Sequence, residues 1–199
     1  MLTLYHAPMS RSVRVRWLLE ELGIPHYIES YSLPELKRAE YVAIHPMGKV
    51  PTLFDAGIVL YESGAIVQYL LERYGQGRLE PTGLRERARF LQWIHFSEAT
   101  LMTPLSEIVM HTKVRKEAER IPALIPDAER RAHSALALVD RALAQSEWLV
   151  GEFSAADVMM GYPIVLASVY GLVTEIYPNL QDYLRQCKAR PAFRRSIAS

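Results

Sequence analysis

The early part of the chain alternates between short segments with a two-residue hydrophobic period and longer segments with a helical period. Residues 2–6 carry apolar side chains at alternate positions, which predicts a β-strand. Pro8 ends this strand, and a helix is predicted to begin near Ser10 and to end at Gly23 and Pro25. One face of that helix is apolar at i, i+3, i+4 and i+7, at Val15, Leu18, Leu19 and Leu22.

The following segments complete a small α/β unit. A second strand is predicted over 26–30, and a less regular helical stretch comes after it. Residues 51–55 and 58–60 flank Ala56-Gly57, which indicates a hairpin. A further helix stops at Gly75 and has one apolar face, made by Ile66, Val67, Leu70, Leu71 and Tyr74. The order βαβαββα, with a right-handed crossover between the first two strands, predicts a mixed sheet with helices on its faces.

Beyond this unit the pattern is helical throughout. Residues 75–83 carry three glycines and a proline, which is typical of a linker. We therefore divide the chain into an α/β domain at 1–76, a linker at 77–83 and an all-α helical bundle domain at 84–199. The helices predicted in the last part cover 84–113 with Pro104 inside, 124–145, a segment that starts at Ser154, 178–189 and 191–197.

Ser154 and Asp157 are spaced as in a capping box at the start of a helix. The serine hydroxyl can accept a backbone N–H at the helix start, and the carboxylate three residues later can accept the N–H of the serine. We expect this pair to fix where the helix begins.

Composition limits the classes of function. Lys and Arg number 23 against 22 Asp and Glu, so no net field draws in nucleic acid or an anionic membrane, and we expect neither as a partner. Arg11, Arg14 and Arg16 are expected to form a solvated helix face, and binding of an anionic ligand near them is the alternative. No apolar run approaches the ~18 residues of a membrane span. The single cysteine, Cys187, is expected to be buried rather than nucleophilic.

Several absences in the sequence narrow the chemistry further. With one cysteine the chain forms no internal disulfide, and its start enters a strand without a signal-peptide pattern, so we expect a cytoplasmic protein. The six histidines lack metal-ligand spacing, and we expect no metal. No Cys-x-x-Cys is present, which excludes the usual thiol–disulfide exchange motif.

Two segments carry candidate binding chemistry. In the first, Val50-Pro51 stands at the start of a predicted strand, where a cis bond would turn the Val50 N–H and C=O away from the sheet. These groups could pair with an extended peptide as an added strand. In the second, Glu62-Ser63 stands where a strand gives way to a helix, whose free N–H groups favour an anion. The Ser63 hydroxyl and the Glu62 carboxylate suit a ligand end that carries both a carboxylate and an ammonium group.

The run Gly48-Lys49-Val50-Pro51-Thr52-Leu53, with Glu62-Ser63-Gly64-Ala65-Ile66 after it, resembles the glutathione site of cytosolic glutathione transferases. The resemblance covers the whole chain, although His45 stands where the family often has asparagine. It implies a thioredoxin-like first domain and an all-α second domain that forms the electrophile pocket and the interface of a homodimer. It also implies that Val50 and Pro51 hold the cysteinyl backbone of glutathione, Glu62 and Ser63 its γ-glutamyl head, and Lys49 its glycine carboxylate.

The same resemblance implies a donor that stabilises the glutathione thiolate, because a free thiol with a pKa of ~8.5 is mostly protonated at neutral pH. Ser10 resembles the serine of the phi, theta and zeta-like classes, at the place where beta-class members have cysteine. Ser12 and Tyr5 are the alternatives, Tyr5 by its likeness to the tyrosine of the alpha, mu and pi classes. Backbone N–H groups alone are a further possibility.

The predicted helix at 84–113 would supply the acceptor side. Its aromatic and methionine residues suit an adaptable apolar pocket, although core packing explains each one singly: Trp93, Phe96, Met102 and Met110. Glu98 is expected to reach the γ-glutamyl amine of glutathione bound to the partner chain, and nothing in the spacing marks His111 as a base.

We therefore expect a transferase that joins glutathione to an apolar electrophile. The alternatives are a glutathione-dependent isomerase, dehalogenase or peroxidase, or a non-enzymatic binding module. A binding module need not retain Ser10, Val50-Pro51 and Glu62-Ser63 together, and their joint presence favours an enzyme.

Overall fold

The computed structural model describes residues 1–198 and divides them into two compact units. The first unit contains residues 1–80 and the C-terminal segment from Lys188 onward, and the second runs from Pro81 to Cys187. Each unit has its own interior, and they are described in turn. No helix in the described residues is long and apolar enough to cross a membrane.

The first unit is built on a four-stranded mixed sheet of order β2-β1-β3-β4. Its strands are β1 (Thr3–His6), β2 (Tyr27–Ser30), β3 (Thr52–Asp55) and β4 (Ile58–Leu60). The central strand β1 is parallel to β2 and antiparallel to β3, so Leu4 lies opposite Ile28 on one side and Leu53 on the other. The predicted strand order along the chain and the parallel pairing of the first two strands are confirmed.

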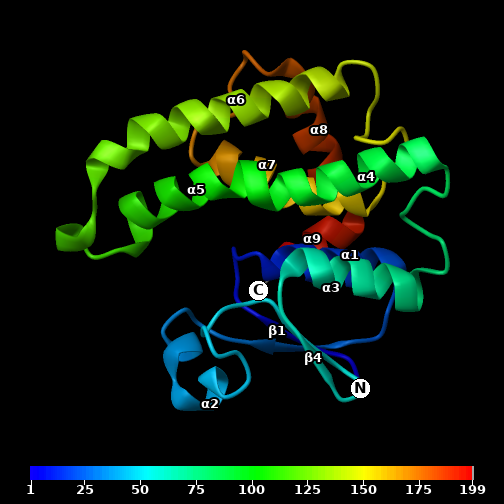
Figure 1. Ribbon diagram of the computed structural model, residues 1–199, viewed down its shortest axis with the longest axis vertical. Coiled ribbons are helices and arrows are strands. Elements are labelled where there is room, and N and C mark those ends of the chain that lie inside the picture. Colours follow the sequence, from blue (N-terminus) through cyan, green and yellow to red (C-terminus); the bar gives the residue numbers. More distant parts are fainter. Residues whose placement is uncertain (199) are drawn as a thin grey trace. The chain divides into compact units, whose positions relative to one another are not determined.

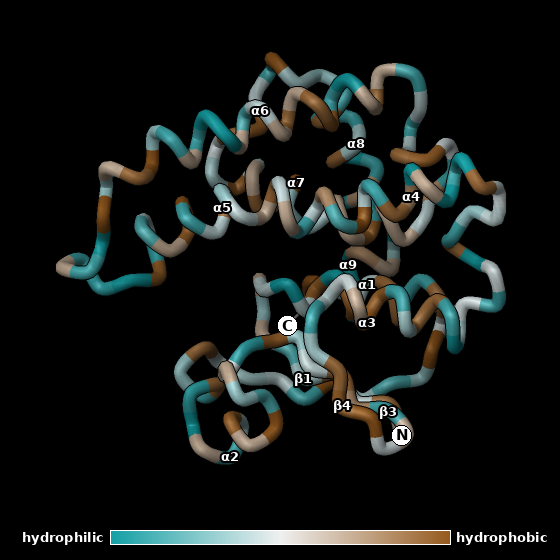
Figure 2. The backbone as a smooth tube through the Cα atoms, viewed as in Figure 1, coloured by the Kyte–Doolittle hydropathy of each residue, from teal (hydrophilic) through white to brown (hydrophobic). Residues whose placement is uncertain are grey.

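The hairpin between β3 and β4 is also confirmed. Ala56 and Gly57 both have positive φ angles, +48° and +86°, which matches the turn that best joins twisted antiparallel strands. Strand β4 forms the edge of the sheet and is apolar along its length (Figure 2). Ile58 and Val59 remain more than two-fifths exposed there.

Helices lie on both faces of this sheet. Helices α1 (Ser12–Leu22) and α3 (Ser63–Leu70) pack side by side on one face (Figure 1). A short turn at Glu35–Lys37 and helix α2 (Ala39–Val42) lie on the other face, where Tyr41 contacts Tyr5 with ring centroids 6.0 Å apart. This is the expected thioredoxin-like arrangement. Because side chains alternate along a strand, Tyr5 and His6 point to opposite faces of the sheet.

The last helix, α9 (Pro191–Ile197), packs against α1 within the first unit. The rings of Trp17 and Phe193 meet edge to face at 4.8 Å, and the Arg190 guanidinium donates to both carboxylate oxygens of Glu21 at 2.6 and 2.8 Å. Paired bonds of this kind fix geometry as well as contributing energy. The domain boundary at residues 77–83 stays a prediction. The contacts of α9 with α1 show that this helix belongs to the first unit.

The second unit is helical, and its main helices follow the predicted ranges. They are α4 (Leu84–Phe96), α5 (Met102–Val109), α6 (Ile125–Leu143), α7 (Ala155–Val169) and α8 (Pro178–Ala189). The predicted helix at 84–113 is one path with two π-helical turns, at Ser97–Leu101 and Met110–Val114. The first of these comes just before Pro104, which has no N–H to donate to the preceding turn, so a local change of helix pitch accommodates it.

The start of α7 is fixed by the predicted capping box. The Ser154 hydroxyl accepts the Ala156 N–H at 3.2 Å, and the Asp157 carboxylate accepts the Ser154 N–H at 2.9 Å. Asp157 has no exposed surface and accepts further bonds from the Leu149 N–H and the Tyr183 hydroxyl, at 3.1 and 3.2 Å. Asp157 therefore joins α7, α8 and the segment before α7.

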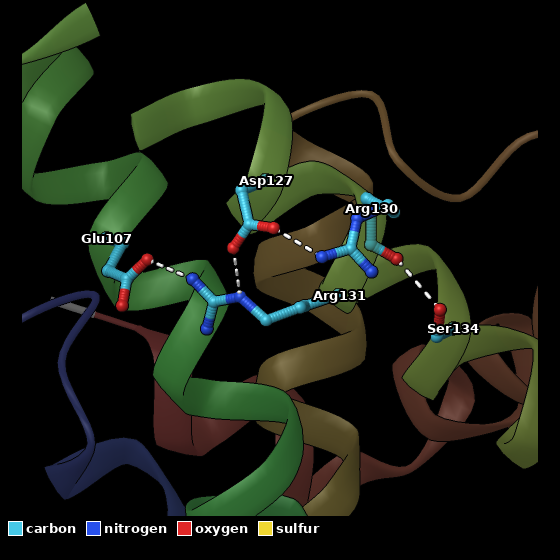
Figure 3. Close-up of polar contacts among 5 residues, drawn as sticks. All are labelled: Glu107, Asp127, Arg130, Arg131 and Ser134. Carbon is cyan, nitrogen blue, oxygen red and sulfur yellow. Dashed lines mark hydrogen bonds and ion pairs between the residues drawn. The ribbon is translucent and has the colours of Figure 1, made fainter. Parts of the chain in front are cut away.

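Helices α5 and α6 are linked at the surface by a chain of ion pairs (Figure 3). Arg131 donates to Asp127 at 2.8 Å, one turn earlier in α6, and also contacts Glu107 of α5. Asp127 in turn accepts a bond from Arg130. All four side chains are at least a third exposed, so this network contributes little to stability compared with the Asp157 cluster.

Candidate functional site

The turn between β1 and α1 brings both candidate serines together in the first unit. The Ser10 and Ser12 hydroxyl oxygens lie 2.7 Å apart, and Ser10 donates to the Ala7 carbonyl at 2.8 Å. Ser10 also accepts the Ser12 N–H at 3.2 Å, so it caps the first turn of α1. The two residues differ in exposure, because Ser12 is fully buried and Ser10 is half-buried.

His6 at the end of β1 lies behind this pair. Its Nδ1 is 2.7 Å from the Ser12 hydroxyl oxygen, and the ring is almost completely buried. Burial and the nearby Arg16 charge lower the pKa of His6 to about 4, which keeps the ring neutral at neutral pH. The sequence reasoning did not select His6, since its partner becomes evident only when the strand and helix are packed together.

Tyr5, the third candidate, lies in a different environment. Its ring packs against Tyr31 and Tyr41 on the α2 face of the sheet, at centroid distances of 6.2 and 6.0 Å. Burial and the Glu29 charge raise the pKa of Tyr5 and disfavour its phenolate. Tyr5 is therefore a component of an aromatic cluster, whereas Ser10 lies at the mouth of α1.

The loop before β3 is held by contacts from the α2 region. Tyr41 donates to the Lys49 carbonyl at 2.7 Å, and its oxygen is 3.0 Å from the Thr52 hydroxyl. Lys37 donates to the carbonyls of Met47 and Gly48 at 3.1 and 3.0 Å. Lys37 is a second cation beside Lys49 that sequence reasoning missed.

Gly48 is required by this loop geometry. Its φ is +57°, and a Cβ placed there would lie 2.3 Å from the Leu36 carbonyl oxygen. His45 contributes as well, because its Nδ1 accepts the Met47 N–H at 3.2 Å. The histidine that stands where the family often has asparagine thus has a structural role in the loop.

The Val50-Pro51 bond is cis, the isomer that would turn the Val50 N–H and C=O away from the sheet. Val50 comes before the first ladder residue of β3, so its N–H and C=O lie outside the sheet pairing. Its side chain is half-buried against the cluster formed by Ala7, Leu36 and Tyr41. Because Ala7 starts the turn that carries Ser10, Val50 and that turn share one packed cluster.

Glu62 and Ser63 form the start of α3. Glu62 has a φ of +67°, a conformation that is unusual for a residue with a side chain and that often marks a functional position. Its carbonyl accepts the Ile66 N–H at 2.9 Å, which begins the helix, while its side chain is exposed and does not cap the helix. The Glu62 carboxylate is therefore available at the helix N-terminus.

Ser63 is buried and accepts a bond from the Arg14 guanidinium at 3.1 Å. Arg14 has no exposed surface, so the expectation of a solvated face is wrong for this residue. The sequence does indicate that Arg14 is buried, because it stands four residues before Leu18 and therefore lies on the same apolar face of α1. The buried cation adds to the positive field at the N-terminus of α3.

The candidates outside this unit lie on the helical path of the second unit. Glu98 is half-buried in the π-helical turn Ser97–Leu101, and its proposed contact with a partner chain stays a prediction. Trp93 and Met102 are buried in the unit's interior, while Phe96 and Met110 are half-buried. The His111 Nδ1 accepts the Ile121 N–H at 2.9 Å, which gives that ring a structural role in the loop before α6.

The groups gathered in the first unit could hold a short extended peptide with an amino-acid head group. Val50 offers backbone groups outside the sheet ladder, and the start of α3 offers N–H donors and a hydroxyl. Ser10 offers a hydroxyl at the N-terminal end of α1. In the described residues, no group of three or more His, Cys, Asp or Glu side chains could hold a metal ion.

Known proteins of similar sequence carry the name glutathione S-transferase. Residues 4–79 match the family model "Glutathione S-transferase, N-terminal domain". The chain is 32% identical to glutathione S-transferase 3 of Schizosaccharomyces pombe, over 98% of this chain and 86% of that protein. It is also 32% identical to glutathione S-transferase GstB of Escherichia coli K12, over 99% and 98% of the two chains.

A solved structure agrees as well. The theta-class glutathione S-transferase of Xanthomonas axonopodis pv. citri, solved with glutathione bound, is 30% identical, covers 100% of this chain and 97% of its own, and superimposes with a TM-score of 0.84. These similarities, together with the thioredoxin-like unit and the helical unit, show that this chain belongs to the glutathione S-transferase family.

Proposed function

We propose that this protein binds glutathione in its first unit and joins the glutathione sulfur to an apolar electrophile. The observation that supports the proposal is that Val50 packs with Ala7 beside the turn that carries Ser10, while Ser63 accepts a bond from Arg14 in the helix that follows this turn. Glutathione bound to the Xanthomonas relative supports the choice of ligand.

Each part of glutathione has a chemical partner in this arrangement. The Val50 N–H and C=O pair with the cysteinyl backbone, because peptide groups outside a sheet ladder accept an added strand. The γ-glutamyl carboxylate binds Ser63 and the N–H groups at the start of α3, and its ammonium binds the Glu62 carboxylate. Lys49, which is exposed, binds the glycine carboxylate.

Ser10 is the proposed donor to the sulfur. A hydrogen bond from its hydroxyl favours the thiolate over the thiol, and the positive end of α1 acts in the same direction. The full burial of Ser12 and the position of Tyr5 in an aromatic cluster on the other face of the sheet favour Ser10 over both alternatives.

The reaction with an aryl halide illustrates the proposed chemistry. The thiol proton leaves to solvent, the thiolate attacks the ring carbon, and a sulfur–carbon bond replaces the carbon–halogen bond as halide departs with the bonding electrons.

We further propose that the protein is a cytoplasmic homodimer. In this dimer, Glu98 approaches the γ-glutamyl ammonium of glutathione bound to the partner chain. Glu98→Gln should then weaken glutathione binding, and an unchanged affinity would remove this part of the proposal.

The decisive assay is conjugation of glutathione to an aryl halide by the wild type, Ser10→Ala and Tyr5→Phe. Ser10→Ala should lower kcat/KM at least about tenfold, because a hydrogen bond to a charged group contributes about 1.5–3 kcal/mol. Tyr5→Phe should keep wild-type kcat/KM. Normal activity in Ser10→Ala, or loss only in Tyr5→Phe, would overturn the assignment of Ser10.

A further inference from the structure

A row of three hydrogen-bonding side chains runs from the interior of the first unit to its proposed sulfur site. The His6 Nδ1 is 2.7 Å from the Ser12 hydroxyl oxygen, which is 2.7 Å from the Ser10 hydroxyl oxygen. His6 is 3% exposed and Ser12 0%, whereas Ser10 is half-buried. The row therefore has a buried end at His6 and an accessible end at Ser10.

Each hydroxyl has one hydrogen and two lone pairs, and the Ser12 oxygen already accepts the Ala7 N–H at 3.2 Å. With Nδ1 of His6 also 2.7 Å from that oxygen, the bonds along the row can run in one of two directions. In the first, the His6 Nδ1–H donates to Ser12, Ser12 donates to Ser10, and Ser10 donates to the Ala7 carbonyl, 2.8 Å away. In the second, Ser10 donates to Ser12, and Ser12 donates to an Nδ1 that has no hydrogen.

The Ala7 carbonyl distinguishes these arrangements. Ala7 is 1% exposed, and the Ser10 and Ser12 hydroxyls lie 2.8 and 3.2 Å from its carbonyl oxygen. The first arrangement gives this buried oxygen a donor. The second commits both hydroxyl hydrogens elsewhere and leaves the carbonyl without a hydroxyl donor, which is costly for a buried backbone group.

The direction of the row also decides what Ser10 offers to a ligand. In the first arrangement the Ser10 oxygen accepts from both the Ser12 hydroxyl and the Ser12 N–H, so only its hydrogen is left to bond a ligand. In the second, Ser10 has given its hydrogen to Ser12 and presents a lone pair. A hydrogen favours a thiolate, and a lone pair favours a thiol.

We propose that His6 is a positioning residue whose Nδ1–H, acting through Ser12, keeps Ser10 a hydrogen-bond donor toward the glutathione sulfur. This inference rests on the proposed function. When Ser10 turns its hydrogen to the sulfur, Ser12 continues to donate to the Ser10 oxygen, and the bond from Ser10 to the charged sulfur offsets the donor that the Ala7 carbonyl loses. The thiol proton goes to solvent, and His6 neither gains nor loses a proton.

The low pKa of His6, about 4, is consistent with this role, because the ring carries a single N–H hydrogen at neutral pH. Arg16 is the charged group whose field acts on His6, together with burial. A neutral ring therefore directs the bonds without adding charge to the site.

The test replaces His6 with Leu, which has no hydrogen-bonding atom, and with Asn, whose amide can donate from the position of Nδ1. The readout is the pKa of the bound glutathione thiol, followed by its ultraviolet thiolate absorbance across pH. His6→Leu should raise this pKa by about one pH unit, the tenfold effect of one hydrogen bond to a charged group. His6→Asn should raise the pKa of the bound thiol by no more than half as much as His6→Leu does.

S-methylglutathione separates the two proposals, since it has the backbone of glutathione but no ionisable thiol. Its affinity should be the same for the wild type and His6→Leu. Failure of the wild type to bind it at millimolar concentration would remove the proposed function itself. Wild-type binding, with an unchanged thiol pKa in His6→Leu, would remove only the role of His6.

Ser12→Ala provides a second test that does not change a large buried side chain. It breaks the row and should raise the thiol pKa as His6→Leu does, so the proposal stays testable if His6→Leu fails to fold. The matched control is His26→Asn, because His26 is a histidine of the same unit whose Nδ1 bonds to the Ile24 carbonyl at 2.7 Å. That variant should leave the thiol pKa unchanged, and a rise equal to that in His6→Leu would contradict a specific relay.

Discussion

The Asp157→Ala variant should destabilise the protein more than any single surface change. The buried carboxylate accepts bonds from the backbone N–H groups of Leu149 and Ser154, and from the side chains of Ser154 and Tyr183. Alanine leaves the two buried N–H groups without an acceptor, at about 1–3 kcal/mol each. The variant also no longer has the cost of burying a carboxylate, which offsets part of this effect. We therefore expect the free energy of unfolding to fall by about 2–4 kcal/mol.

Urea unfolding followed by circular dichroism measures this loss. With an m value of about 2–3 kcal/mol per M, the unfolding midpoint should fall by about 0.7–2 M. Asp127→Ala is the matched control, since Asp127 is also a helix-start carboxylate but is 54% exposed. It should change the free energy of unfolding by less than about 1 kcal/mol. Equal midpoints for wild type and Asp157→Ala would refute the reasoning.

The pH dependence of the free energy of unfolding provides a second test of Asp157, because its direction can be predicted. Burial outweighs the hydrogen bonds and raises the pKa of Asp157 from 3.8 to about 6, so the folded state holds this proton more tightly than the unfolded state does. The associated stability is present below pH 3.8 and is lost as pH rises through about 6. Relative to Asp157→Asn, which does not titrate, the wild type should lose about 2 kcal/mol between pH 4 and pH 7. A constant difference, or one of opposite sign, would contradict this.

Other predictions follow from single contacts. Gly48→Ala should abolish most glutathione binding, because the new Cβ would lie 2.3 Å from the Leu36 carbonyl oxygen and displace the loop that carries Val50. A wild-type Kd for this variant in calorimetry would contradict this prediction. Arg14→Met should weaken glutathione binding about tenfold, since it removes the charged donor to Ser63, and an unchanged Kd would count against that contact. Arg131→Gln should lower the free energy of unfolding by less than about 1 kcal/mol, and by less still at high salt. A decrease of more than about 2 kcal/mol would contradict the conclusion that these ion pairs contribute little to stability.

The order of elements could be predicted from the sequence because each carries a local signal. The hairpin has Ala56-Gly57, and α7 has its capping box at Ser154, so turn and cap chemistry set those boundaries without long-range information. The helices 178–189 and 191–197 begin at prolines, which favour the first helical position, and their predicted bounds match α8 and α9.

Features that depend on long-range packing were not predictable in the same way. The contact of His6 with Ser12 depends on how β1 meets α1, and the contact of Arg14 with Ser63 joins residues from separate helices. The choice between Ser10 and Ser12 rests on exposure, which two hydroxyls so close in sequence do not reveal. The packing of α9 with the first unit depends on Phe193 and Arg190 meeting a helix near the start of the chain.

The central claim is that the first unit binds glutathione through Val50 and the start of α3. Calorimetric titration of the wild type and Ser63→Ala with glutathione tests it most directly. We predict that the wild type binds at millimolar concentration or below and that Ser63→Ala binds about tenfold more weakly, since its charged ligand loses one hydrogen bond. Absence of wild-type binding at millimolar glutathione, or equal affinities for the two proteins, would contradict the account.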